Sequence, residues 1–121
     1  MNVTVNERGA SKVAVVVSPD ILISDSQSAL DLMATIRYNQ GCDKVIVKKA
    51  NVEERFFDLK TGLAGEVMQK FTNYHFRFAI VGDFDSYTSK ALRDLIYESN
   101  KGKHILFLKT EQEALDALHG V

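Results

Sequence analysis

Cysteine is nearly absent from this sequence, which contains one among 121 residues, Cys42. One cysteine cannot form an internal disulfide, and three histidines beside it are too few for a structural zinc cage. The lack of a disulfide and of a zinc cage fits a reducing compartment, so we expect a cytoplasmic protein. Cys42 lies just before an apolar run, so we expect a half-buried residue where a strand begins. Nothing in the sequence nominates a histidine to activate it as a catalytic thiol.

An excess of charge of one sign is also lacking, because 15 basic and 16 acidic residues give a net charge of −1. Nucleic-acid binding requires lysine and arginine gathered on one face, so we expect no nucleic-acid partner. The longest apolar run, Val13–Val17, is far shorter than the ~20 residues of a membrane-spanning helix. The first residues do not resemble a signal peptide. We therefore expect no membrane partner.

What the sequence does contain is typical of one globular domain. Hydrophobic residues make up 45% of the chain and charged residues 26%. A chain of this length buries enough surface for a core without disulfides or metals. No linker, repeat or low-complexity segment interrupts it. We therefore expect one domain over residues 1–121, with no cofactor and no metal.

Apolar periodicity predicts alternating strands and helices. We expect strands near 3–5, 13–17, 45–47, 76–81 and 105–108. We expect helices between Ser24 and Gly41, at about 61–74 and 86–100, and from Thr110, which forms a capping box with Glu113. The first two strands are close enough to form an antiparallel hairpin. The resulting fold class is α/β, with a mixed, mostly parallel sheet of about five strands and about four helices.

The first candidate site is the segment Lys60-Thr61-Gly62-Leu63-Ala64-Gly65. A hydroxyl and two glycines at a helix N-terminus can bind an anion, because free N–H groups and the helix dipole point there. The alternative, which we favour, is that Thr61 caps the helix while Gly62 and Gly65 let it pack closely on the sheet. The spacing is not that of a P-loop.

The second candidate site follows the fourth predicted strand and consists of Gly82, Asp83 and Asp85. Two carboxylates at this spacing could hold a magnesium ion. The alternative, which we favour, is that Asp83 shapes the turn while Asp85 or Ser86 caps the next helix. The three histidines match no metal motif and no catalytic triad.

Most of the chain resembles an uncharacterised bacterial family, domain-of-unknown-function family 4180. The matching segments are Ala29–Ala34, Phe56–Glu66, Ala79–Phe84, Ser89–Leu92 and Tyr97–Asn100. This resemblance implies no activity.

A more remote resemblance is to STAS domains, the fold of anti-sigma-factor antagonists, which have the same order of elements. Lys60-Thr61-Gly62-Leu63 resembles part of their Asp-Ser-Ser-Gly-Leu-Gly motif, and Thr61 stands where that family carries a phosphorylated serine. The chain departs from the motif because a lysine precedes Thr61 and because Asp58 lies one residue too far upstream. The resemblance implies a SpoIIAA-like regulatory domain that binds another protein.

Two classes of function therefore stay open. The first is a non-enzymatic regulatory or protein-binding module, switched by phosphorylation at a helix N-terminus. The second is a small-molecule or phosphate-ligand binding protein, or an enzyme, that uses the loops after the third and fourth strands. A homodimer is a further prediction, in which exposed aromatic side chains would form an apolar patch. The candidates for it are Phe56, Phe57, Phe84 and Tyr87, and the alternative is that most of them belong to the core.

Overall fold

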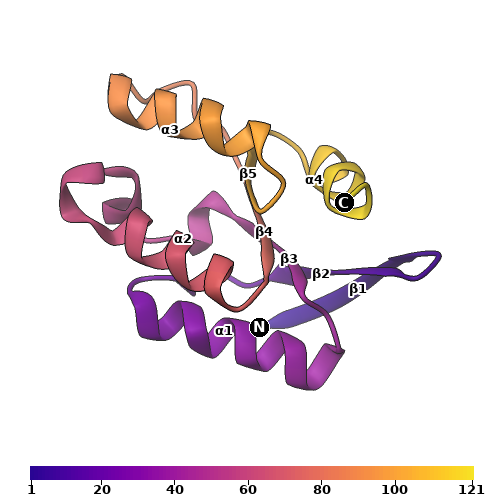
Figure 1. The fold of residues 1–121 in the computed structure, drawn as a ribbon. Coiled ribbons are helices and arrows are strands. Elements are labelled where there is room, and N and C mark those ends of the chain that lie inside the picture. The colour runs from indigo at the N-terminus through magenta and orange to yellow at the C-terminus, as the bar shows by residue number, and fades with distance from the viewer.

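The computed structural model describes residues 1–121 as one sheet flanked by helices (Figure 1). The strands are β1 (Asn2–Arg8), β2 (Ser11–Val17), β3 (Lys44–Lys48), β4 (Arg77–Val81) and β5 (Ile105–Leu108). The α-helices are α1 (Ser26–Gln40), α2 (Leu63–Asn73), α3 (Lys90–Lys101) and α4 (Glu111–His119). Three 3-10 helices lie between β3 and α2, namely η1 (Lys49–Asn51), η2 (Glu54–Phe57) and η3 (Leu59–Thr61). The predicted order of strands and helices is confirmed.

The five strands form one sheet in the order β1-β2-β3-β4-β5. β1 and β2 pair antiparallel, and Arg8 faces Ser11 across a turn of two residues. Gly9 opens that turn with a φ of 61°, a conformation that glycine adopts without strain. The three other strand pairs are parallel, so the predicted mixed, mostly parallel sheet is confirmed.

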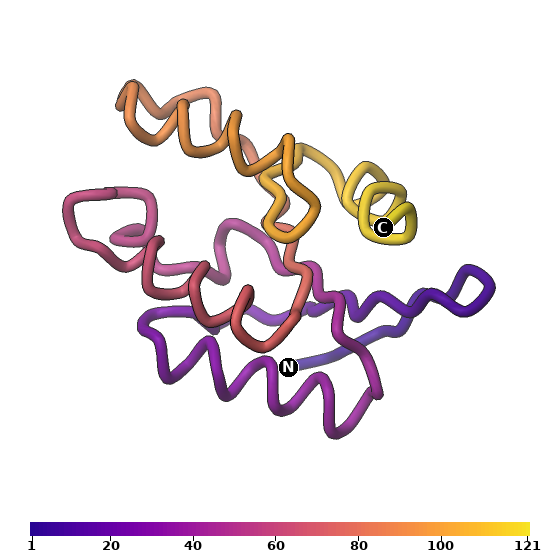
Figure 2. Tube along the Cα trace, in the orientation of Figure 1, coloured from indigo at the N-terminus to yellow at the C-terminus, as the bar shows by residue number.

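Each parallel crossover steps one strand in the same direction across the sheet. Since such crossovers are right-handed, the three crossover helices lie on one face. Figure 1 shows α1, α2 and α3 stacked along one side of the sheet and α4 alone on the other side. In the tube of Figure 2, the hairpin of β1 and β2 extends beside α4. The strand order never reverses, so the sheet lacks the crevice where doubly wound folds bind ligands.

Two separate hydrophobic clusters hold these layers together. The larger has 23 buried residues and lies between the sheet and α1 to α3. The smaller has eight buried residues and joins the sheet to α4. Its members are Val13, Val15, Ile46, Ala79, Leu106, Ala114, Leu115 and Leu118. One short helix therefore covers this face of the sheet over β2 to β5.

The helix ends follow their capping residues. Asp25 caps α1, its carboxylate accepting the Ser28 N–H at 2.7 Å, and Gly41 ends the helix with a φ of 65°. α3 begins four residues later than predicted, because Ser89 supplies the N-cap oxygen in place of Asp85 or Ser86. None of the four helices combines the length and the apolar character needed to traverse a bilayer.

The aromatic side chains proposed as an exposed patch belong to the core. Phe56 and Phe57 are 0% and 3% exposed, and Phe84 and Tyr87 are partly buried against the larger cluster. The Phe57 ring stacks on the Tyr87 ring at a centroid distance of 5.3 Å. The prediction that these four residues form an exposed patch is wrong, because η2 turns Phe56 and Phe57 inward and the loop after β4 places Phe84 and Tyr87 against Phe57. The alternative, that most of them belong to the core, is correct.

Candidate functional site

A buried asparagine organises the segment between β3 and α2. Asn51 is 1% exposed, and its Nδ2 donates to the carbonyl oxygens of Ser18 at 2.8 Å and Asp20 at 2.9 Å. Its Oδ1 accepts the Lys48 N–H at 3.1 Å. The side chain thus ties the end of β3 to the chain that follows β2. The sequence gives no sign that Asn51 is buried, because it is a polar residue among charged ones.

Thr61 ends η3 directly before α2, and it is exposed. Its hydroxyl oxygen lies 2.8 Å from the carbonyl oxygens of both Arg55 and Asp58, and it donates its one hydrogen to one of them at a time. The same oxygen accepts the Leu63 N–H at 3.3 Å. The hydroxyl therefore joins η2, η3 and the first turn of α2.

The glycines near Thr61 have different roles. Gly62 is the N-cap residue of α2, with a φ of 77° that carries the chain from η3 into the helix. Gly65 is exposed, and a Cβ there would meet open space. The prediction that these glycines permit close packing on the sheet is therefore wrong. The predicted capping role of Thr61 is correct in part, because its hydroxyl binds a helical N–H although Gly62 is the cap residue.

Charges of both signs surround Thr61. The Asp58 carboxylate accepts the Lys60 N–H at 3.3 Å, and both residues are exposed. Glu66, in the first turn of α2, accepts the Ser26 hydroxyl at 3.4 Å. The first N–H groups of a helix have no intrahelical acceptor, so the start of α2 favours an anion. Local charge therefore neither excludes nor strongly attracts a phosphate.

The loop after β4 has its own internal bonds. The Asp83 carboxylate accepts the Asp85 N–H at 2.9 Å, which agrees with the predicted role in shaping the turn. Asp85 instead forms an ion pair with Lys109 at 3.0 Å, and this hydrogen bond raises the pKa of Lys109. No group of three or more His, Cys, Asp or Glu side chains is placed to hold a metal ion.

The loops after β3 and β4 line one pocket of about 540 Å³, which includes Lys48, Lys49, Gly82 and Asp83. A Cβ on Gly82 would lie 2.6 Å from the Lys49 Cβ, so the two loops touch here. Asp58, Lys60, Thr61, Gly62 and Asp85 do not line this pocket. The structure therefore brings together only some of the predicted site residues, namely Gly82 and Asp83.

Tyr87 and Glu54 lie together beside this pocket, and the sequence analysis assigned Tyr87 to an apolar patch and Glu54 to no site. The Tyr87 hydroxyl donates to the Glu54 carboxylate at 2.6 Å, and the Lys49 Nζ lies 4.7 Å from the Tyr87 ring centroid. Burial raises the pKa of Tyr87, and the bond to Glu54 adds to this effect. Tyr87 is therefore a neutral donor at physiological pH.

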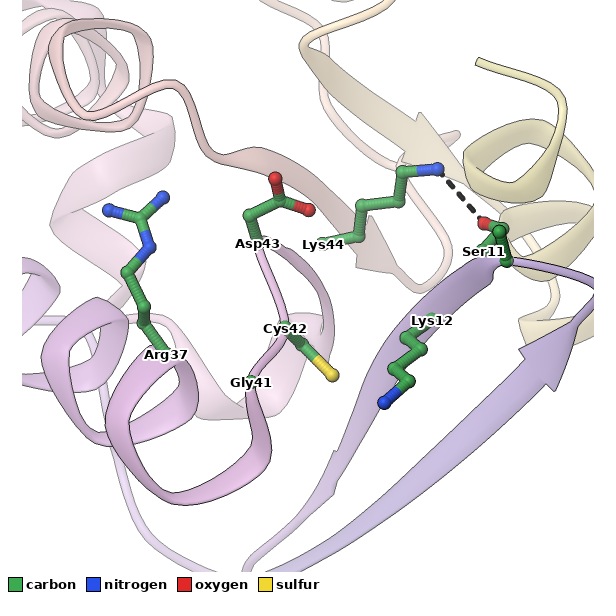
Figure 3. A pocket seen from close by; sticks show the side chains of 8 residues that line it. Ser11, Lys12, Arg37, Gly41, Cys42, Asp43 and Lys44 are labelled. Carbon is green, nitrogen blue, oxygen red and sulfur yellow. Dashed lines mark hydrogen bonds between the residues drawn. The ribbon is translucent and has the colours of Figure 1, made fainter.

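A second pocket, of about 300 Å³, lies at the opposite end of the parallel strands (Figure 3). The Cys42 sulfur points toward Lys12, and the thiol pKa is raised mainly by burial. Cys42 is 2% exposed, so it is more deeply buried than predicted. The cations beside it are engaged elsewhere, since Lys44 donates to Ser11 at 3.0 Å and Arg37 to the Tyr74 carbonyl at 3.0 Å.

These features define a class of protein: one α/β domain whose candidate site residues are mostly exposed and lie in two loops, the one before α2 and the one after β4. The particular family follows from the sequence. The profile of the family described as "Domain of unknown function (DUF4180)" matches residues 8–118, and the chain belongs to this family. This membership confirms the first resemblance described above.

Comparison with curated proteins found no match. Among solved structures, the chain is similar to a crystal structure of a candidate anti-sigma factor antagonist from Thermotoga maritima. The two share 12% sequence identity and a TM-score of 0.46, over 97% of this chain and 94% of the other. That description names the class of protein to which the remote resemblance pointed.

Proposed function

We propose that this protein is a non-enzymatic regulatory module that binds another protein through the surface around η3 and the start of α2. The observation that carries the proposal is the Thr61 hydroxyl, which is exposed and yet donates to a carbonyl oxygen at 2.8 Å. A group that is both accessible and structural can convert a chemical modification into a change of shape.

Phosphorylation of Thr61 supplies that modification in the proposal. The ester oxygen has no hydrogen to donate, so it would face the carbonyl oxygens of Arg55 and Asp58 without a bond. The phosphate also adds about −1.5 to −2 charges to a surface that a partner protein would contact. The loss of the donated hydrogen bond favours movement of η2 and η3 away from their present positions. A partner that reads this surface would then distinguish the two states.

The test combines mass spectrometry with matched variants. Protein isolated from its own host should carry a phosphate on Thr61. Thr61→Val removes the donor without charge, whereas Thr61→Glu removes the donor and adds charge. Both should shift the backbone NMR signals of residues 54–62, and Thr61→Glu should also change the affinity of any protein that co-purifies.

Thr110 is the matched control, because it is also exposed and its hydroxyl also accepts a helical N–H, from Glu113 at 3.1 Å. Thr110→Glu should shift signals at the start of α4 and leave partner binding unchanged. An unmodified Thr61 in the host, together with equal partner affinity for wild type, Thr61→Val and Thr61→Glu, would disprove the proposal.

A second candidate function is binding of a small anionic molecule. It is supported by the pocket of about 540 Å³, where Lys48 and Lys49 form no ion pair. A thermal-shift screen with inorganic phosphate, nucleotides and sugar phosphates tests it, because a ligand at 100 times its Kd stabilises a fold by about 2.7 kcal/mol. Lys49→Met keeps the aliphatic stem and should abolish any such shift. No shift with any of these ligands would rule this function out for the compounds tested.

A further inference from the structure

The end of α4 is bonded to the hairpin through both nitrogens of one imidazole. His119 Nδ1 lies 2.7 Å from the Ser11 hydroxyl, and His119 Nε2 lies 2.8 Å from the Asn6 side-chain oxygen. These bonds span 108 and 113 residues of sequence. Figure 2 shows this proximity, with the C-terminal helix beside the hairpin.

The partners of the two nitrogens determine the protonation state of the ring. An amide oxygen only accepts, so Nε2 carries a hydrogen and donates it to Asn6. The Lys44 ammonium only donates, and it binds the Ser11 oxygen at 3.0 Å. The Ser11 hydroxyl hydrogen is therefore directed to Nδ1, which accepts it. This chain of donors is complete only when His119 is neutral.

Few other contacts hold this end of α4. The apolar stripe of the helix consists of three buried residues, Ala114, Leu115 and Leu118. The Arg8–Asp116 ion pair, at 2.7 Å, is exposed on both sides, and pairs of that kind contribute little. Lys44 on β3 also donates to the Val121 oxygen at 3.0 Å, just beyond the helix. The two bonds of His119 are thus the side-chain hydrogen bonds by which the last turn of α4 itself contacts the hairpin.

The charges around His119 oppose its protonation. Burial lowers the pKa of His119, and Arg8 on β1 and Lys44 on β3 lower it further, while Asp116 on α4 acts in the other direction. The hydrogen-bond partners of the ring, Asn6 and Ser11, are neutral, and the Val121 oxygen is bound by Lys44 at 3.0 Å. A histidine released from the sheet regains its ordinary pKa near 6.5. Acid therefore favours the released helix, and the docked state loses stability as pH falls below about 6.5.

We propose that His119 is a pH-sensitive latch: its neutral imidazole holds α4 on the sheet, and protonation of the imidazole shifts the equilibrium toward the released helix. Release uncovers the apolar sheet face formed by Val13, Val15, Ile46, Ala79 and Leu106. The rest of the domain stays folded, because α1, α2 and α3 pack on the other face through a separate cluster.

Amide hydrogen exchange at pH 7.5 and pH 5.5 tests the latch on the full chain. Exchange rates are converted to protection factors, and the α4 amides are compared with the α1 amides, which report unfolding of the larger cluster. The ratio of the α4 to the α1 protection factor should be lower at pH 5.5 than at pH 7.5. The decrease is at most about tenfold, because protonation of a released histidine with a pKa of 6.5 stabilises the released state by about that factor between these pH values.

Variants separate the latch from a general effect of acid. His119→Gln cannot titrate, so its ratio of α4 to α1 protection should not depend on pH. His104 is exposed, and His104→Gln should show the same pH dependence as wild type. Lys44→Gln keeps a donor for Ser11 but removes a charge that lowers the pKa of docked His119, so the fall in the ratio between pH 7.5 and pH 5.5 should be smaller than in wild type. A wild-type ratio that is the same at both pH values, or a fall that persists in His119→Gln, would overturn the proposal. If His119→Gln does not fold, a fall of wild-type size in Lys44→Gln has the same meaning.

Discussion

Replacement of Asn51 by alanine should destabilise the domain more than any other single polar truncation. The change removes three hydrogen bonds at 2.8, 2.9 and 3.1 Å and leaves the Ser18 and Asp20 carbonyls and the Lys48 N–H without that partner. Each bond contributes about 1 kcal/mol net, so the expected loss is about 3 kcal/mol. For a domain of this size that loss lowers Tm by about 12 °C, taking about 4 °C per kcal/mol.

Urea unfolding followed by circular dichroism measures this loss. Asn73→Ala is the matched control, because Asn73 is exposed and accepts only a bond from Gln69, at 2.8 Å. We expect a change within about 0.5 kcal/mol for the control. Asn51→Asp preserves the shape but removes both donors, and its destabilisation should grow as pH rises above about 4 because the charged carboxylate faces two carbonyl oxygens. A loss below about 1 kcal/mol for Asn51→Ala would refute the assignment of Asn51 as the anchor of this segment.

Two other perturbations test the packing. In thermal unfolding, Gly82→Ala should lower the free energy of unfolding by about 1–3 kcal/mol, because the new Cβ would lie 2.6 Å from the Lys49 Cβ. Gly65→Ala, whose new Cβ meets open space in α2, should raise the free energy of unfolding by about 0.5–1 kcal/mol. Equal effects of the two substitutions would contradict the contact between Gly82 and Lys49. Cys42 should react with a thiol reagent much more slowly in the folded protein than in urea, since the thiol is buried and its pKa is raised; equal rates would contradict its burial.

The order of elements could be predicted because its signals are local. Apolar runs such as Val13–Val16 and Val45–Val47 are buried in strands of the sheet, and Gly41 ends α1 as its freedom of φ requires. α4 starts where predicted, because the Thr110 hydroxyl accepts the Glu113 N–H at 3.1 Å. Such signals depend on side-chain periodicity and capping, which the sequence displays directly.

The segments around the candidate site could not be predicted in the same way. The chain from Lys49 to Gly62 forms three 3-10 helices, whose period matches neither a strand nor an α-helix. Its conformation depends on Asn51, which bonds to residues more than thirty positions away. The start of α3 was misplaced because Asp85, Ser86 and Ser89 are all acceptable caps in sequence, and only the structure distinguishes them. Proximity of loops, as at Gly82 and Lys49, likewise has no local signal.

The uninterrupted strand order has a kinetic consequence. Every strand pairs with its neighbour in sequence, so the sheet can grow from the hairpin without waiting for distant segments to meet. The bonds of α4 to Asn6, Arg8 and Ser11 are the exception, because they join residues 108 to 113 positions apart. Closing such a loop costs more entropy than closing any crossover. Docking of α4 is therefore expected as the last step of folding, and the two ends of the chain meet only after the sheet between them exists.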